Sequence, residues 1–187
     1  PVISKVFKHC IIDRYCMFLV TSDNQFGFKK SVGCSHAVFT LRNVVSYCVS
    51  YNSTVNICAL DLSKAFDKMN HYGLFIKLMD RQIPVQFLQL LEFWFRSGLT
   101  CVKWGDCFSA FYSQARGIRQ GGVLSPYLFA LYIGSVIEKV RRSRVGCEIK
   151  LESVGIIVYV DDILLVAPTV TALQLLLKMC ENELNWL

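Results

Sequence analysis

Two adjacent aspartates, Asp161 and Asp162, stand between short apolar runs at 156–160 and 163–167. Each run has the length and β-branched composition of a buried strand, which predicts a tight hairpin with two carboxylates at its tip. Two like charges at one bend are unfavourable unless a cation shares the site. Mg²⁺, which binds a few carboxylate oxygens together with substrate phosphates, fits this pattern. From these residues alone, an exposed Asp-Asp turn remains the alternative.

A third carboxylate, Asp61, follows an apolar run at 55–60 that predicts another strand. In an antiparallel sheet, a strand end and a hairpin tip can lie side by side. We therefore expect Asp61, Asp161 and Asp162 to converge on one edge, which would hold two Mg²⁺ ions for an in-line phosphoryl displacement. Taken singly, Asp61 could equally be the N-cap of a following helix.

The remaining segments supply a scaffold for such a sheet. Gly105-Asp106 lies between two short strand-like runs and predicts a two-residue hairpin. From Val55 onward, strands, helices and hairpins alternate, which favours an α+β fold with an antiparallel sheet and helices on one face. Helical patterns cover 35–48 with Ser35 as N-cap, 74–78, 85–95, 127–140 with Ser125 as N-cap, and 173–187.

Composition narrows the class of protein. The 187 residues suffice for one domain with a core, and 53% of them are hydrophobic. No run reaches the roughly 18 apolar residues of a membrane-spanning helix, so no membrane partner is expected. The net charge of +6 suits a polyanion partner, and nine cysteines without a C-x-x-C pair indicate free thiols rather than disulfides or zinc. Because the chain starts at Pro1 and stops at Leu187 inside a helical pattern, we expect a fragment.

Four segments resemble, in order, the motifs of reverse transcriptases of non-LTR (LINE-type) retrotransposons. Residues 25–30 (QFGFKK) are similar to the segment that closes the fingers, and residues 59–68 (ALDLSKAFDK) to the first catalytic motif. Residues 117–126 (GIRQGGVLSP) resemble the second motif and residues 159–162 (YVDD) the third. Where the family usually has Ala before the two aspartates, this chain has the bulkier Val160.

The resemblance implies a right-hand polymerase fold. Residues 1–54 would be a partial fingers region and residues 55–187 a palm that carries the three carboxylates and stops before the thumb. The implied activity is RNA-directed DNA polymerisation, in which dNTPs extend a primer 3′-hydroxyl with two Mg²⁺ ions, or Mn²⁺ in their place. A group II intron maturase, or a decayed palm that binds RNA without catalysis, are the alternatives.

The same resemblance implies partners. They are an RNA template, a DNA primer, dNTPs and the rest of the polyprotein, which would include the thumb; the resemblance leaves open whether an endonuclease is attached. DNA integration in the nucleus would be the setting, by family resemblance only.

The resemblance also implies roles for individual residues. Asp61 and Asp161 would be the principal metal ligands, Asp162 the third acidic group, and Leu62 a ligand through its backbone carbonyl. Phe66 would be the aromatic gate beneath the sugar, which rejects a 2′-hydroxyl. Other nucleotide contacts would be Gln120, Gly121 and Tyr159, and nucleic-acid contacts Gly122, Lys29 and Lys30. By residue type alone, the aromatics could be core residues, the glycines a flexible loop and the lysines a solvated basic turn.

Overall fold

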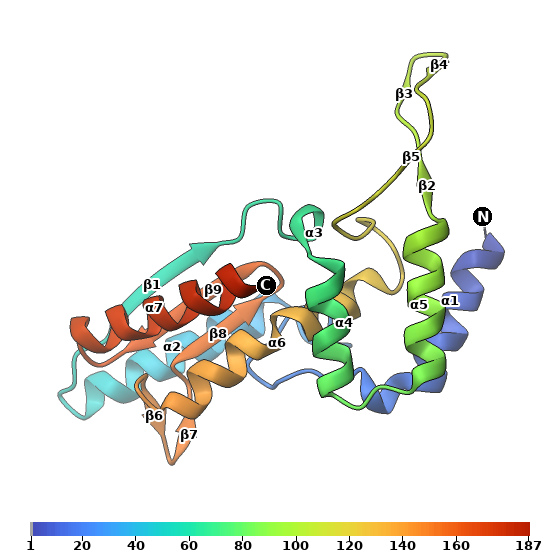
Figure 1. The fold of residues 1–187 in the computed structure, drawn as a ribbon. Helices are drawn as coiled ribbons and strands as arrows, with labels where there is room; N and C mark the ends of the chain where they lie inside the picture. Colours follow the sequence, from blue (N-terminus) through green and yellow to red (C-terminus); the bar gives the residue numbers. More distant parts are fainter. Residues whose placement is uncertain (1) are drawn as a thin grey trace.

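The computed structural model describes residues 2–187 and is built around a three-stranded antiparallel sheet (Figure 1). Its strands are β1 (Asn56–Asp61), β8 (Ile156–Tyr159) and β9 (Asp162–Ala167), in the order β1-β9-β8. The predicted strands and hairpin are present, but the turn lies one residue earlier than predicted, so that Asp162 belongs to β9 rather than to the tip. Tyr159 pairs with Asp162, so the turn of the β8–β9 hairpin consists of residues 160 and 161.

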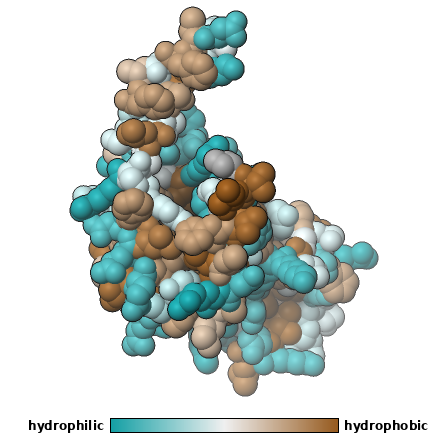
Figure 2. All heavy atoms as spheres, turned by 90° about the vertical axis from the view of Figure 1, so that its right-hand side faces the viewer, coloured by the Kyte–Doolittle hydropathy of each residue, from teal (hydrophilic) through white to brown (hydrophobic). Residues whose placement is uncertain are grey.

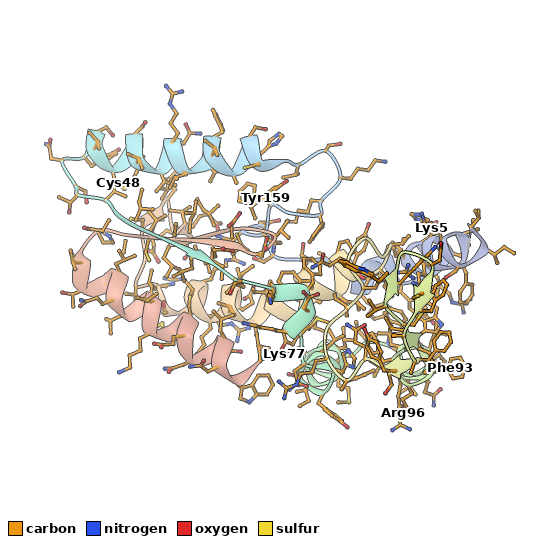
Figure 3. The ribbon with its side chains drawn as sticks, turned by 90° about the horizontal axis from the view of Figure 1, so that it is seen from above. Lys5, Cys48, Lys77, Phe93, Arg96 and Tyr159 are labelled. Atoms are coloured by element: carbon orange, nitrogen blue, oxygen red, sulfur yellow. The ribbon has the colours of Figure 1, made fainter. Side chains whose placement is uncertain are left out.

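Helices pack on both faces of this sheet, which Figure 3 shows lying between α2 and α7. α6 (Ser125–Ser143) and α7 (Val170–Trp186) cover one face, whereas the sequence predicts helices on one face only. α2 (Cys34–Ser50) covers part of the other face, where Val44 and Cys48 pack against Val166. The side chains buried beneath α6 and α7 include Ile156, Val158, Ile163, Leu165 and Ala167.

The starts of α2 and α6 differ from the predicted N-caps. α2 begins after Gly33, whose N–H donates to the imidazole Nδ1 of His36 at 3.1 Å, so Ser35 lies inside the helix. α6 begins at Ser125 itself, with Leu124 as the N-cap residue and no side-chain cap, and the Ser125 hydroxyl donates to the carbonyl of Arg119 at 2.6 Å. As predicted, most of α6 is buried on all sides.

An ion-paired carboxylate joins the helices under the sheet. Glu183 of α7 contacts Lys77 of α4 (His71–Asp80) at 3.0 Å and Lys139 of α6 at 3.1 Å. Burial alone would raise the pKa of the Glu183 carboxyl, but the hydrogen bonds from these two lysines lower it to about 2. The pair of contacts fixes α7 relative to two other helices.

A second helical group lies beside the sheet. α1 (Val2–Tyr15), which the sequence analysis does not predict, is followed by the short helix η1 (Cys16–Phe18) and packs against α5 (Val85–Ser97). The Tyr15 ring stacks on Phe87 with centroids 4.8 Å apart. α4 and α5 contain the two helical segments predicted at 74–78 and 85–95.

Beyond α5, residues 99–113 form a narrow projection that we call the arm (Figure 2). β2 (Leu99–Thr100) pairs with β5 (Tyr112–Ser113), and β3 (Lys103–Trp104) pairs with β4 (Cys107–Phe108) around the predicted Gly105-Asp106 turn. A further small hairpin joins β6 (Glu148–Ile149) to β7 (Glu152–Ser153). Within residues 2–187, no helix has both the length and the apolar character to cross a membrane.

Candidate active site

The sheet register places the three aspartates at one edge. Asp61, the last residue of β1, is paired with Asp162, the first residue of β9. The Leu62 N–H donates to the carbonyl of Asp161 at 3.3 Å, which extends this pairing into the turn. Paired residues of an antiparallel sheet face the same side. Asp61 and Asp162 therefore share the face opposite α6 and α7, and both are exposed, whereas Asp161 is half-buried.

These carboxylates have no cation beside them among residues 2–187, because the ion pairs there all involve other acidic groups. Within the same residues, no three metal-ligating side chains are close enough to hold an ion by themselves. The backbones converge as expected, but a ready three-carboxylate cluster does not exist. Because Mg²⁺ commonly uses one or two carboxylates and completes its shell with water and substrate phosphates, this donor set still fits the ion.

The Leu62 carbonyl, which the resemblance assigns to a metal, accepts the Ala65 N–H at 3.1 Å. A carbonyl oxygen has two lone pairs, so one remains for a ligand. This bond leads into the short helix α3 (Ala65–Lys68), which carries Phe66. The Phe66 ring stacks on Phe129 of α6 with centroids 4.5 Å apart and meets Phe28 edge-on at 6.1 Å.

The glycine loop, residues 117–122, is docked onto α3. The Gly117 N–H donates to Met69 at 2.7 Å, and the Ile118 N–H donates to Phe66 at 2.8 Å. Gly117 has φ +82°, and a Cβ there would lie 2.5 Å from the carbonyl oxygen of Asp67. Only glycine allows this close approach, so the loop is held against the element that carries Phe66.

Gln120 lies within reach of α3, because its Nε2 is 3.5 Å from the Asp67 carboxylate. Gly121 has φ +72° with open space around its Cβ position, so its backbone conformation rather than a close contact requires glycine. A Cβ on Gly122 would lie 2.5 Å from the Ser125 hydroxyl. The close approach at Gly122 is therefore internal to the loop.

The remaining sequence candidates lie in different surroundings. Tyr159, labelled in Figure 3, is half-buried and lies on the same face as Asp162, its partner across the hairpin. Lys29 donates to the carbonyl of Ser22 at 2.7 Å and pairs with Asp23 at 3.6 Å, so it closes its own loop. Lys30 is exposed.

A cleft of about 630 Å³ adjoins the glycine loop and runs between α1, α5 and the base of the arm. Its lining contains no Asp or Glu. Its cationic, imidazole and aromatic side chains are those of Lys8, His71, Trp94, Phe95 and Arg119. His71 is held in place by stacking on Phe95, with centroids 4.3 Å apart, and by a 2.7 Å hydrogen bond between its Nε2 and the Gly117 carbonyl.

Sequence reasoning assigned no role to Gln25, Gly27 or Gly117. All three lie inside the motifs at residues 25–30 and 117–126, and membership of a motif is the only sequence feature that points to them. Their contacts join segments distant in sequence, however, and no local pattern reveals such contacts. Gln25 is the most informative of them, because its buried side chain contacts the turn of the carboxylate hairpin.

Comparison with known proteins agrees with the motifs. The family model described as "Reverse transcriptase (RNA-dependent DNA polymerase)" matches residues 1–187. The chain is 30% identical over 129 residues to the Pol polyprotein of the type-1 retrotransposable element R2 of Nasonia vitripennis, covering 69% of this chain and 12% of that protein. It is 31% identical over 139 residues to the probable RNA-directed DNA polymerase of the transposon X-element of Drosophila melanogaster, covering 71% of this chain and 15% of that protein.

Two solved structures share the fold at low identity. Telomerase from Candida albicans, in complex with a fragment of telomeric RNA, superposes with a TM-score of 0.61 at 14% identity, over 95% of this chain and 31% of that one. Apo telomerase from Candida tropicalis gives a TM-score of 0.62 at 12% identity, over 95% of this chain and 36% of that one. The expected polymerase fold is thereby confirmed.

Proposed function

The chain belongs to the reverse transcriptase family, and we propose that it is the palm and part of the fingers of a LINE-type RNA-directed DNA polymerase. The transposon relatives favour this assignment over a group II intron maturase or a decayed palm. Because the chain spans only 12 to 15% of these relatives, a complete polymerase would need further segments, including a thumb. We propose a nuclear setting, from the family resemblance alone.

The observation that carries the proposal is the cross-strand pair of Asp61 and Asp162, with Asp161 in the adjoining turn. Asp61 and Asp161 would hold two Mg²⁺ ions together with the triphosphate, assisted by the free lone pair of the Leu62 carbonyl. When bound, the ions supply a more acidic primer 3′-hydroxyl and neutralise charge on the departing pyrophosphate. The exposure of Asp61 and Asp162 supports access of a substrate from this face.

The elements around the carboxylates would orient the nucleotide. Phe66, fixed by its stacking on Phe129, would lie beneath the sugar and reject a 2′-hydroxyl by direct clash. Gln120 and Gly121 would contact the incoming nucleotide from the docked glycine loop, with Gly122 next to the template and Tyr159 near the primer end. We assign Lys30 rather than Lys29 to nucleic-acid contact, since Lys29 is engaged within its own loop.

The cleft beside the glycine loop suits the RNA template. Its lining combines cationic groups with aromatic rings and lacks carboxylates, a combination that favours a single-stranded polyanion with stacked bases. Lys8 and Arg119 would neutralise phosphates, and the Lys8 ammonium lies over the Trp94 ring, 5.4 Å from its centroid.

Primer extension tests the proposed activity. The full-length protein that carries this chain is incubated with an RNA template, a DNA primer, Mg²⁺ and either dNTPs or rNTPs. We expect extension with dNTPs only, and none by the Asp161→Asn/Asp162→Asn variant. In Phe66→Ala, rNTP incorporation should rise. Template binding without extension by the unaltered protein would instead favour a non-catalytic RNA-binding palm.

A further inference from the structure

The segment at residues 24–27 is added to the edge of the central sheet. The Phe26 N–H donates to the Val158 carbonyl at 2.8 Å, and the Val158 N–H donates to the Asn24 carbonyl at 2.8 Å. These bonds make a parallel bridge between Gln25 and Val158 of β8. The Asn24 side chain adds a 2.7 Å bond to the carbonyl of Ile156. The segment is therefore fixed along the strand that leads into the carboxylate hairpin.

Within this segment, the Gln25 side chain is fully buried, with 0% exposure. Its Oε1 accepts the Gly27 N–H at 2.9 Å and the Val160 N–H at 3.2 Å. Both partners are donors, so the atom that faces them must be the oxygen. Its Nε2 is buried without a hydrogen-bond partner among residues 2–187. Since burying an unpaired donor is costly, the oxygen end is the part that the site requires.

Val160 is the residue that most needs this support. It has φ +61°, a left-handed conformation that is unfavourable for a β-branched side chain, and it directly precedes Asp161. Gly27 packs tightly against the same residue: a Cβ there would lie 2.6 Å from both the backbone N and Cγ2 of Val160. The Gln25 oxygen and the Gly27 backbone therefore both contact the turn at Val160.

We infer that Gln25 is a positioning residue for polymerisation, which holds the Val160–Asp161 turn in its left-handed conformation and so sets the place of the Asp161 carboxylate relative to Asp61. This inference rests on the proposed function and deepens it. It assigns the segment at 24–27 a task at the carboxylates rather than at the nucleic acid. Gln25 acts through the turn and does not itself touch substrate.

Kinetics of the full-length protein test this role. Gln25→Met keeps the side-chain length but removes the acceptor oxygen. We expect it to lower kcat by about tenfold or more, because small displacements of reacting groups have effects of this order. The Mg²⁺ concentration for half-maximal extension should rise as well. A smaller folded fraction would lower kcat without moving that concentration.

A rescue separates the role in the turn from a general loss of packing. In a Val160→Gly background, the left-handed turn is no longer strained, so Gln25→Met should lower kcat there by less than about threefold. Equal losses of kcat in both backgrounds would overturn the inference, because Gln25 would then act independently of the turn.

Hydrogen exchange provides a readout that needs no activity. In Gln25→Met, the backbone amides of residues 156–163 should exchange at least about tenfold faster, since the Val160 N–H loses its acceptor. Gly27→Ala should produce the same change by displacing the turn. Gly33→Ala is the matched control, because a Cβ on Gly33 has no atom within 4 Å.

The two proposals fail in different ways. If the unaltered protein does not extend a primer but exchange rises in both variants, the polymerase assignment fails while the Gln25 support of the turn stands. If the unaltered protein extends and Gln25→Met matches it in kcat, Mg²⁺ dependence and exchange, the inference is overturned. Should Gln25→Met not fold, Gly27→Ala against Gly33→Ala decides the question by the same three measurements.

Discussion

Two hairpins in this chain have two-residue turns that differ in what stabilises them. In the arm, Gly105 and Asp106 connect β3 and β4, and Gly105 has φ +59°. At the carboxylate edge, Val160 and Asp161 connect β8 and β9, and Val160 has φ +61°. Glycine adopts this conformation without a steric penalty, whereas valine requires compensation from its surroundings.

The surroundings of the two turns differ accordingly. The arm strands are exposed on both sides, and Trp104 next to its turn is 86% exposed. The β8–β9 strands are buried beneath α6 and α7, and the Val160 N–H in their turn donates a hydrogen bond to the Gln25 side chain. The arm hairpin is therefore specified by its local sequence, whereas the carboxylate hairpin is specified by tertiary contacts that can also fix a functional group.

The most direct test of this difference replaces the aspartate in each turn by asparagine. Asp161→Asn should lower primer extension by at least about a hundredfold, the scale for losing one group that stabilises transition-state charge. Asp106→Asn is the matched variant in the arm turn and should leave extension unchanged. Thermal unfolding of both variants should match that of the unaltered protein. Comparable losses of extension would mean that both turns serve the reaction.

Core truncation tests the difference in packing. Ile163 of β9 is 0% exposed, so Ile163→Ala should destabilise the fold by about 2–5 kcal/mol, as in other large-to-small core substitutions. Trp104→Ala in the arm should change stability by less than about 0.5 kcal/mol. Chemical denaturation with a constant m-value measures both. A large effect of Trp104→Ala would show that the arm is packed in solution.

Acid should destabilise the packing of α7 against α4 and α6, the helices beneath the carboxylate hairpin. Glu183, with its pKa lowered to about 2, favours the folded state when ionised. The stabilisation is complete above the unfolded-state pKa of about 4.3 and is lost as the pH falls toward 2, a loss of about 2–3 kcal/mol. Unfolding measured from pH 6 to 2 should show this decline. Glu183→Gln should lose most of that pH dependence, and an unchanged profile would contradict the assignment.

The smallest expected effect is local to the arm. Gly105→Val places a β-branched residue at φ +59°, which costs about 1–3 kcal/mol in the turn. Because the arm has little packing to lose, we expect faster amide exchange over residues 99–113 and no change in global unfolding. Gly33→Ala, at an extended glycine with open space, should leave exchange in the arm unchanged. A lower global stability for Gly105→Val would mean that the arm supports the rest of the fold.

Several features of the fold follow from local sequence. The strand before Asp61, the carboxylate hairpin and the buried helix after Ser125 were predicted from apolar runs and turn residues, because burial and backbone preference act there over a few neighbouring positions. The Gly105-Asp106 hairpin belongs to the same class. The four motifs also identified the family, which the match over residues 1–187 confirms.

Other features depended on contacts that the local patterns do not contain. The helix at 2–15 was not predicted, and α2 covers the sheet face opposite α6 and α7. Ser125 is the first residue of its helix rather than its N-cap, and its hydroxyl donates to the Arg119 carbonyl across the glycine loop.

The carboxylate edge shows most clearly which features follow from local sequence and which depend on tertiary contacts. Local patterns predict that a strand ends at Asp61 and that a hairpin carries Asp161 and Asp162. They do not predict how the turn is held, which depends on a hydrogen bond between Val160 and a glutamine 135 positions away in the chain. A left-handed valine is unfavourable by local preference, so its conformation depends on partners that only folding brings together.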